Sequence, residues 1–384
     1  LYKLVNQPRL NGGYVKKRIV WNNETLRQDY GRDYLATVPK YDGFCTVPEH
    51  ARYQPVIGKF LNLYEPIDHR PEEGDFTHIQ SLVRHIFGEQ YELGMDYLQL
   101  LYLHPVQKLP ILLLVSEERN TGKSTFLNFL KALFQNNVTF NTNEDFRSQF
   151  NSDWAGKLLI LVDEVLLNRR EDSERLKNLS TTLSYKMEAK GKDRDEIAFF
   201  AKFVLCSNNE YLPVIIDAGE TRYWVRKIDR LQSDDTDFLQ KLKAEIPAFL
   251  HFLQRRNLST EKESRMWFAP SLLHTEALRK IIRSNRNRLE IEIHELILDI
   301  MESVGTDTFS FCPNDILVLL VNTQVKAEKH QVRKVLQECW KLTPAPNGLT
   351  YTTYQLNYNR ECRYEPIRRV GRYYTITREQ LESL

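Results

Sequence analysis

The stretch SEERNTGKST, residues 116–125, has the residue types and spacing of a loop that binds phosphate. Loops of this kind follow the pattern G-x-x-x-x-G-K-[ST]. Gly122, Lys123 and Ser124 match its end, whereas Glu117 occupies the position of the first glycine. A glycine lets the backbone approach phosphate closely, a lysine supplies positive charge, and a hydroxyl binds Mg²⁺. The sequence therefore predicts a nucleotide site with an unusual first turn.

The missing glycine changes the geometry that we expect for this turn but does not exclude phosphate binding. Asn120 tolerates the left-handed backbone that would otherwise require glycine, and we expect Glu117 to point away from the nucleotide. An ordinary surface turn that caps a helix is the alternative for the motif taken alone. ATP with Mg²⁺ is the expected ligand. The residues expected to contact it are Asn120, Thr121, Gly122, Lys123, Ser124 and Thr125.

A second stretch, LLILVDEV at residues 158–165, places two carboxylates directly after an apolar run. If that run is a buried parallel strand, Asp163 and Glu164 lie at its carboxyl end, where open α/β sheets bind ligands. Asp163 would then hold Mg²⁺ through water, with a hydroxyl of Ser124 or Thr125 on the same ion, and Glu164 would act as a general base toward water. An exposed acidic turn is the alternative. The distance along the chain from the loop predicts that this strand is a neighbour of the loop strand.

Polar residues after later apolar runs would complete the site. Asn208 follows the run FVLCS and could orient a water molecule, with an asparagine-rich turn as the alternative. Arg222 and Arg226 lie in GETRYWVRKI, where an arginine could reach a γ-phosphate held by a neighbouring subunit. A surface ion pair is the alternative for either arginine.

Basic residues around Gly191 suit contact with nucleic acid. Lys190 and Lys192 flank this glycine in YKMEAKGKDRDEIAFF, residues 185–200. A basic loop with a glycine turn can follow the phosphate backbone of a single strand. Acidic residues in the same stretch nearly cancel its charge, so a solvated charged loop is the alternative.

The composition indicates a globular chain without a dominant charge. Its 384 residues are 42% hydrophobic, and 53 basic against 51 acidic residues leave a net charge of +2. A nucleic-acid surface must therefore be local. The five cysteines form no C-x-x-C pair, which favours a reducing compartment, and no apolar run approaches the roughly 18 residues that cross a bilayer. We expect a cytoplasmic location, in a bacterial cell or a phage-infected host, without a membrane partner.

Apolar runs and helical periodicity predict an α/β fold with a parallel sheet. The runs at 111–115, 158–162 and 198–207 are typical of buried strands, and residues 123–134 and 171–186 of helices between them. The alternation of strands and helices favours parallel pairing.

Helical spacing continues on both sides of this core. Helices are predicted within 76–103, over 238–256 and over 286–302, with Pro247 in the first turn of its helix. Residues 313–341 contain two short helical stretches, followed by the β-rich TYTTYQLNYN and GRYYTIT. Two helices and then a β-hairpin is the order of a winged-helix module.

The predicted organisation has five segments. They are an irregular, partly β lead-in at 1–75, a helical segment at 76–109, a P-loop ATPase core at 110–230, a second helical segment at 231–305, and a winged-helix-like module at 306–384.

Taken in order, RNTGKST, LLILVDE, the basic region, FVLCSNN and GETRYWV resemble the core of superfamily 3 helicases of the AAA+ type. These are the primase-helicases of phages, plasmids and large DNA viruses. The segment FLNLYEPIDHRPEEGD also looks like the lead-in of phage and mobile-element members. The resemblance covers roughly residues 55–290, and Glu117 is its main departure.

The resemblance implies a hexameric ring that moves along single-stranded or forked DNA with ATP. It also implies a primase domain in a longer protein, of which this chain, without an initiator Met, is expected to be a fragment. The positions that it implies are Lys123 and Ser124 for phosphate and Mg²⁺, Asp163 and Glu164 for the acidic pair, Lys190 and Lys192 for DNA, Asn208 for the sensor and Arg222 for the arginine finger.

We therefore expect an ATP-dependent DNA helicase or translocase. A nucleotide-dependent DNA loader or switch without unwinding uses the same ATPase core, so the sequence leaves it open. A P-loop kinase would need an acceptor pocket, whereas the acidic pair and Asn208 favour water as the nucleophile. The arginine- and tyrosine-rich residues 360–378 would touch phosphates as a wing or form a solvated edge strand.

Overall fold

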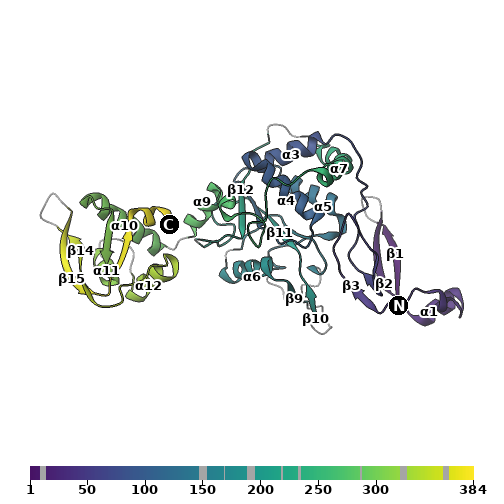
Figure 1. The fold of residues 1–384 in the computed structure, drawn as a ribbon, viewed down its shortest axis with the longest axis horizontal. Helices are drawn as coiled ribbons and strands as arrows, with labels where there is room; N and C mark the ends of the chain where they lie inside the picture. Colours follow the sequence, from purple (N-terminus) through teal and green to yellow (C-terminus); the bar gives the residue numbers. More distant parts are fainter. Residues whose placement is uncertain are drawn as a thin grey trace. The chain divides into compact units, whose positions relative to one another are not determined.

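A computed structural model describes residues 1–8, 14–146, 154–167, 169–187, 195–217, 219–231, 235–285, 288–320, 327–357 and 363–384. The described residues form two compact units. One consists of residues 1–47 and 53–64, and the other of residues 48–52 and 65–384. Figure 1 labels the elements along the chain.

The smaller unit contains a hairpin, short helices and a three-stranded sheet, so strands are present in the segment predicted to be partly β. Buried Asn62 organises it, because its amide accepts from the backbone N–H of Val47 (3.0 Å) and Tyr64 (3.1 Å) and donates to the carbonyls of Val47 and Gln54. Its elements are β1 (Tyr2–Pro8), β2 (Tyr14–Val20), α1 (Asn23–Tyr30), α2 (Tyr34–Thr37), β3 (Gly43–Cys45), β4 (Val56–Ile57) and β5 (Phe60–Asn62).

A parallel sheet lies at the centre of the larger unit, which confirms the predicted α/β fold. Its described strands are ordered β12-β6-β11-β8-β7. The strand that precedes the acidic pair was expected beside the loop strand, and this prediction is wrong, because β11 pairs with both and separates them. The strands are β6 (Ile111–Val115), β7 (Val138–Phe140), β8 (Leu159–Val162), β11 (Lys202–Ser207) and β12 (Tyr223–Lys227).

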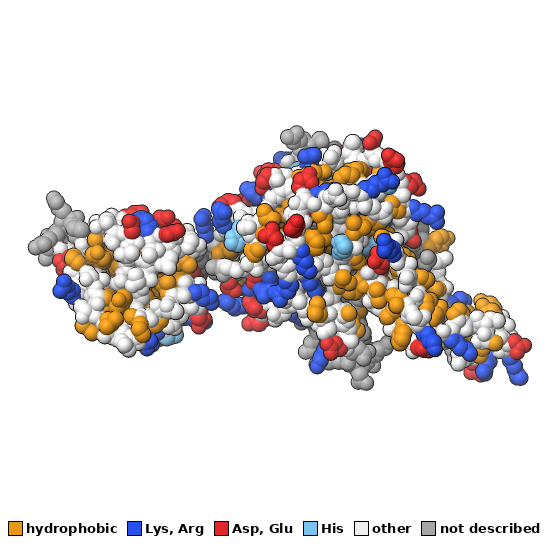
Figure 2. Space-filling view, viewed as in Figure 1, with side chains coloured by type: hydrophobic (Ala, Val, Ile, Leu, Met, Phe, Trp, Pro, Cys, Tyr) orange, Lys and Arg blue, Asp and Glu red, His pale blue; other side chains and the backbone are white. Residues whose placement is uncertain are grey.

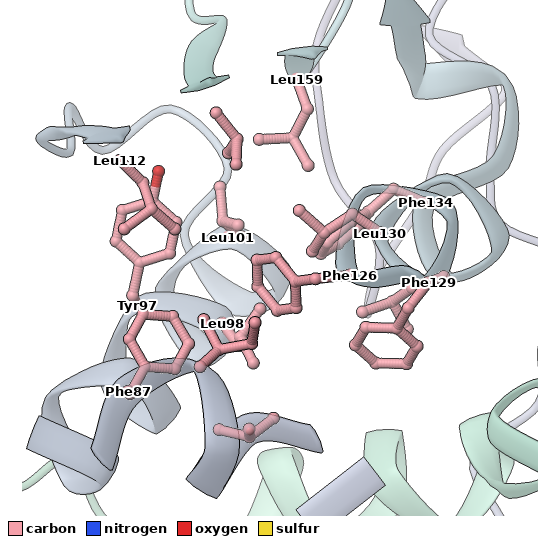
Figure 3. Packing of buried hydrophobic residues seen from close by; sticks show 14 of the residues in the cluster. Phe87, Tyr97, Leu98, Leu101, Leu112, Phe126, Phe129, Leu130, Phe134 and Leu159 are labelled. Carbon is pink, nitrogen blue, oxygen red and sulfur yellow. The ribbon is translucent and has the colours of Figure 1, made fainter. Parts of the chain in front are cut away.

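One face of this sheet is covered by a large apolar cluster drawn from four helices. Side chains of the loop helix, including Phe126 and Leu130, meet Leu98 and Leu101 of an earlier helix and Leu159 of the sheet (Figure 3). Both helices predicted within 76–103 and the helix predicted over 123–134 are confirmed. The helices are α3 (Thr77–Phe87), α4 (Tyr91–Leu103), α5 (Lys123–Phe134) and α7 (Phe238–Arg255).

Pro247 lies in the interior of α7 rather than in its first turn, so that expectation is wrong. A proline there cannot donate to the carbonyl four residues earlier. The helix continues because its apolar side chains, among them Ile246, Phe249 and Leu250, are buried against the sheet-facing cluster. Tertiary packing therefore outweighs the local cost of the proline.

The opposite face packs against α6 (Arg170–Thr181) and α9 (Glu276–Ser284), with α8 (Pro270–Leu273) just before α9. A helix was predicted over residues 171–186, and this prediction is wrong after residue 181, where α6 ends. Residues 184–187 instead form β9 (Ser184–Met187), which pairs antiparallel with β10 (Asp195–Ala198).

The single strand predicted over residues 198–207 corresponds to two elements in the structure, because this part of the chain pairs first with β9 and then with β8 and β6. Residues up to Ala198 belong to the β9–β10 hairpin, and the parallel strand β11 begins only at Lys202. Figure 1 shows this hairpin beside α6, below the sheet in that view.

A separate apolar cluster holds the C-terminal elements, and α10 supplies Ile293, Ile297 and Ile300 to it. The predicted hairpin between TYTTYQLNYN and GRYYTIT is wrong. Strand β14 pairs with β15, which the sequence did not reveal, and β16 pairs with β13. The elements are α10 (Arg288–Val304), β13 (Thr308–Phe311), α11 (Pro313–Leu320), α12 (Lys329–Lys334), a π turn (Val335–Cys339), β14 (Leu349–Leu356), β15 (Tyr364–Gly371), β16 (Tyr374–Thr377) and α13 (Arg378–Ser383).

Three of the arginines within 360–378 are paired with carboxylates. They are Arg363 with Asp299 (3.0 Å), Arg369 with Asp315 (2.6 Å) and Arg378 with Asp307 (3.0 Å). Asp315 is buried and also accepts from the Tyr351 hydroxyl (2.6 Å), so it fixes the β14–β15 hairpin to α11. Much of the positive charge of this stretch is therefore neutralised within the module.

Charges of both signs are interspersed over the face shown in Figure 2, in keeping with the small net charge. Within the described part of the chain, every helix is too short or too polar to cross a lipid bilayer.

Two buried lysines lie near the amino ends of the sheet strands. The amine of Lys108 donates to the carbonyl of Phe199 (2.7 Å), and that of Lys202 donates to the carbonyl of Pro105. Burial lowers the pKa of Lys108 to about 8, and burial followed by repulsion from Lys108 lowers the pKa of Lys202 well below its usual value. Lys202 therefore favours the neutral amine in the folded protein, whereas Lys108 loses its proton as the pH rises through about 8.

This burial makes stability depend on pH. The unfolded chain binds more protons than the folded chain between about pH 8 and the usual lysine pKa of 10.5, so the free energy of unfolding rises with pH in that window. We expect Lys108→Met to reduce this rise by up to about 1.4 kcal/mol per pH unit. Urea unfolding at pH 8, 9 and 10 measures it. The exposed Lys243→Met is the control, and an unchanged slope in Lys108→Met would contradict the explanation.

Candidate nucleotide site

Hydrogen bonds join the segments that follow β6, β11 and β8 at the carboxyl edge of the sheet. Ser116, after β6, donates its backbone N–H to the carbonyl of Ser207 (3.2 Å). Val165, after β8, donates to the carbonyl of Cys206 (2.7 Å), and the Ser207 hydroxyl donates back to the carbonyl of Val165 (3.0 Å). Because β11 contacts both neighbours, the loop and the acidic pair meet although their strands are not adjacent.

Two residues with left-handed backbone bend the loop. Asn120 has φ 55°, as the sequence predicted for a residue that replaces glycine, and Gly122 has φ 79° at the N-cap of α5. Neighbouring segments hold these residues in place: Leu231 donates its N–H to the carbonyl of Asn120 (3.0 Å), and His85 Nε2 lies 3.0 Å from the carbonyl of Thr121. The predicted start of the helix at residue 123 is confirmed.

Glu117, in the first-glycine position, is anchored through its backbone. Its N–H donates to Oε1 of Glu210 (3.2 Å), while the Glu117 side chain is exposed. Glu210 is buried, and its other oxygen accepts from Lys280 (2.8 Å) and lies 3.4 Å from the amine of Lys227. Glu210 was not predicted from the sequence, although it directly follows Asn208 and Asn209.

Lys123 and Ser124 begin α5 at this edge. The amine of Lys123 is buried and donates to the Thr121 hydroxyl (3.0 Å). Burial lowers its pKa, and the nearby Cys206, Asp163 and Glu210 partly oppose that effect. The exposed Ser124 hydroxyl donates to Oδ2 of Asp163 (2.7 Å), so a hydroxyl and a carboxylate oxygen lie together beside the loop.

Glu164 stands beside Asn208 with its carboxylate exposed. The Asn208 amide donates to Oε1 of Glu164 at 3.3 Å. Glu164 has φ 60°, an uncommon conformation for a residue other than glycine, and its carbonyl accepts from the Asn143 amide (3.2 Å). The structure thus brings Asp163, Glu164 and Asn208 to one edge together with the loop.

Arg222 lies at the opposite edge of the same sheet. Its carbonyl accepts from the N–H of Ile111, the first residue of β6, whereas the loop follows Val115 at the other end of that strand. Four residues of strand span about 13 Å. Arg222 therefore does not lie beside the loop of its own chain.

Arg226, the other candidate arginine, is buried and paired. It points to the same face as Trp224, and its guanidinium donates to Glu89 (2.7 Å) and Gln90 (3.0 Å). These bonds connect β12 to the turn between α3 and α4. Arg226 therefore forms an ion pair within its own chain, which was the alternative to a role at a γ-phosphate.

Two further basic residues surround the tip of the loop and were missed from the sequence. A shallow hollow is lined by Glu118, Arg119, Asn120 and Arg230. Arg119 is inside the quoted loop, but Arg230 follows β12 and reaches it only through the fold.

The predicted DNA-contacting residues Lys190 and Lys192 lie outside the described residues. The strands on either side of them, β9 and β10, pair as a hairpin. Within the described ranges, no cluster of three or more His, Cys, Asp or Glu side chains has the arrangement of a metal site. A Mg²⁺ ion held partly by phosphate and water does not require such a cluster.

Comparison with known proteins gives a family match over the site and a fold match over most of the chain. A family profile described as a family of unknown function (DUF5906) matches residues 114–226, which include the loop, the acidic pair, Asn208 and Arg222. A search of curated proteins finds no match.

Solved structures of the NrS-1 C-terminal region share the fold. Its apo structure aligns with a TM-score of 0.65 at 17% identity, covering 93% of this chain and 91% of that chain. An A-form apo structure of this region aligns with a TM-score of 0.62 at 16% identity, covering 94% and 95%. A further A-form structure gives a TM-score of 0.57 at 18% identity, covering 85% and 80%. The likeness extends beyond the sheet to nearly the whole chain.

The left-handed Gly122 generates a test of the loop geometry. An added Cβ would lie 3.4 Å from Leu231, an ordinary contact, so the conformation rather than crowding limits substitution. We expect Gly122→Ala to lower the free energy of unfolding by about 1–2 kcal/mol, and Gly122→Asn to lower it less. Urea unfolding checks this, with Gly348→Ala as the control, because Gly348 has open space and no positive φ. Equal stability of Gly122→Ala and the wild type would contradict the assigned conformation.

Proposed function

We propose that this chain is an ATP-driven motor that moves along single-stranded DNA and unwinds duplex DNA as a ring of identical subunits. The observation that carries the proposal is the 2.7 Å hydrogen bond between Ser124 and Asp163. It joins the end of a phosphate-loop motif to an acidic strand end, as a site for a nucleotide with Mg²⁺ requires. The ordered resemblance to superfamily 3 helicases then directs the proposal toward DNA.

The oxygen atoms at this edge fit a magnesium nucleotide. Mg²⁺ is usually held by one or two protein oxygens together with waters and substrate phosphates. Ser124 and Asp163 would hold the ion, and both are exposed at the loop. Bound Mg²⁺ would neutralise charge on the β- and γ-phosphates of ATP.

The protein residues divide the remaining work between binding and hydrolysis. The Lys123 amine and the backbone N–H groups of Thr121 and Gly122 would hold the phosphates. Glu164 would accept a proton from the attacking water, which Asn208, donating to Glu164 in this structure, would orient. The left-handed conformation of Glu164 supports a functional role, because such strain is concentrated at active sites.

Arg222 would act on a nucleotide bound by a neighbouring subunit. Its position at the sheet edge opposite the loop supports this assignment, because it does not lie beside its own site. Two different edges that meet between copies form a head-to-tail contact, which closes into a ring when the rotation allows.

The DNA contacts in this proposal come from the sequence resemblance. Lys190 and Lys192, between the strands of the β9–β10 hairpin, would contact single-stranded DNA. The C-terminal elements would act as a winged-helix-like module, with Arg368 as an exposed arginine on β15 that has no carboxylate partner among the described residues. A primase domain would belong to the longer protein.

Substitutions in the site separate binding from hydrolysis. We expect Lys123→Ala to abolish both ATP hydrolysis and unwinding of a forked duplex. Glu164→Gln should keep ATP binding and lower the hydrolysis rate at least about 100-fold, since general-base catalysis contributes a factor of about 10²–10⁴. Hydrolysis with and without single-stranded DNA, nucleotide binding and unwinding are measured for each variant.

The control for this test lies on α6, a different element from those that carry Lys123 and Glu164. Glu171→Gln removes an exposed carboxylate from α6 and should leave hydrolysis unchanged. Wild-type hydrolysis by Lys123→Ala would refute the site. DNA-stimulated hydrolysis by the wild type without any unwinding would assign the chain to loaders or switches instead.

A further inference from the structure

Glu220 holds the guanidinium of Arg222 at the amino edge of the sheet. Its carboxylate is almost fully buried, and Nη1 of Arg222 donates to both oxygens, at 3.0 Å and 2.8 Å. The same carboxylate accepts from the backbone N–H groups of Thr221 (3.0 Å) and Arg222 (2.9 Å). The acidic residue and the arginine are therefore fixed to each other by backbone and side chain together.

This contact leaves part of the guanidinium available. The Arg222 side chain is 32% exposed, against 7% for Glu220. Nη1 is engaged twice, and Nε is buried without a hydrogen-bond partner among the described residues. Among the described residues, Nη2 of Arg222 makes no hydrogen bond. An arginine held by one nitrogen can present another to an anion outside its own chain.

A buried lysine fixes Glu220 from the side of α6. The amine of Lys177 lies 3.8 Å from Oε2 of Glu220 and donates to Glu174 (3.0 Å) and Asp217 (3.1 Å). Arg170 lies 3.4 Å from the other oxygen of Asp217. Glu220 therefore lies between two cations among the described residues, with Arg222 at 2.8 Å and Lys177 at 3.8 Å.

The same helix connects this cluster to the chain's own candidate site. Residues 163 and 164, the acidic pair, directly follow β8, and α6 begins at Arg170. The first turn of α6 carries Arg170, and its third turn carries Lys177. A short covalent path therefore runs from the acidic pair of one subunit to the residues that hold its Arg222.

We propose that Glu220, supported by Lys177, is a positioning residue that presents Arg222 to the γ-phosphate bound by a neighbouring subunit. This inference rests on the proposed function of the site. The carboxylate fixes one side of the guanidinium and its buried position fixes the carboxylate, so the free nitrogen keeps one direction before a nucleotide arrives. Such preorganisation matters because catalytic groups must be held in place before the transition state forms.

The first test measures how Glu220→Gln changes hydrolysis. The amide keeps the shape but loses the negative charge, so it cannot accept from Arg222 as strongly. We expect kcat for ATP to fall at least 10-fold while KM and ATP binding stay within about threefold, because the variant's own loop is intact. Arg222→Ala should show the same pattern, and Glu171→Gln on α6, the helix that carries Lys177, should match the wild type.

The second test mixes two variants, each of which is expected to hydrolyse ATP poorly or not at all when alone. Glu220→Gln subunits have an intact loop but a displaced arginine, whereas Lys123→Ala subunits have a defective loop and a well-placed arginine. In a randomly mixed head-to-tail ring, about a quarter of the interfaces combine the intact loop with the intact arginine. We expect an equal mixture to hydrolyse ATP well above the sum of the separate variants.

The outcomes separate this inference from the function on which it rests. Activity of Lys123→Ala alone would overturn the proposed site. If Lys123→Ala is inactive as expected, then wild-type hydrolysis by Glu220→Gln, or no gain in the mixture, would overturn the role of Glu220 only. If Glu220→Gln does not fold, as thermal unfolding would show, Glu220→Asp is used, since it keeps the charge but shortens the reach. Glu220→Asp should also lower kcat and gain activity in the mixture, and failure of either refutes the role.

Discussion

The pairing of β11 with both β6 and β8 is the constraint on which the rest of the site depends. Each of the three strands ends at the same edge, and hydrogen bonds between Ser116, Ser207 and Val165 fix the segments that follow them. The loop and the acidic pair come from strands that do not touch. They meet because β11 pairs with both strands and so aligns the positions at which the loop and the acidic pair leave the sheet. Asn208, at the tip of β11, is thereby placed between them.

The two edges of the sheet have complementary roles in this arrangement. The carboxyl edge gathers the residues suited to hold a nucleotide, whereas the amino edge fixes Arg222 through Glu220. Because a parallel sheet separates its edges by the length of its strands, one chain cannot bring the two sets together. An assembly that places one edge against the other would complete the site. This separation of the two edges is consistent with the proposed head-to-tail assembly.

Structural features that depend on neighbouring residues were predicted from the sequence. Features that depend on contacts between distant segments were missed. The bounds of α5 and the left-handed Asn120 follow from local signals, so both were predicted. The order of the strands depends on which edges meet, and no local signal separates β8 from β6. The prediction for residues 182–202 failed because the apolar residues of this segment belong to two different sheets. Glu210 was missed because its partners, the N–H of Glu117 and the amine of Lys280, are distant along the chain. Glu220 hydrogen-bonds to its neighbours in the chain, but its burial beside Lys177 of α6 depends on the fold.

The position of Glu117 shows how distant contacts can replace a local rule. A glycine there would allow a left-handed turn, but in this chain that turn is made by Asn120 and Gly122, later in the loop. The N–H of Glu117 is held by the buried carboxylate of Glu210, which Lys280 and Lys227 hold in turn. The start of the loop is thus fixed at Glu117 to the segment that follows β11 rather than left free to bend. The exposed side chain of Glu117 takes no part in this constraint, because its backbone N–H carries it.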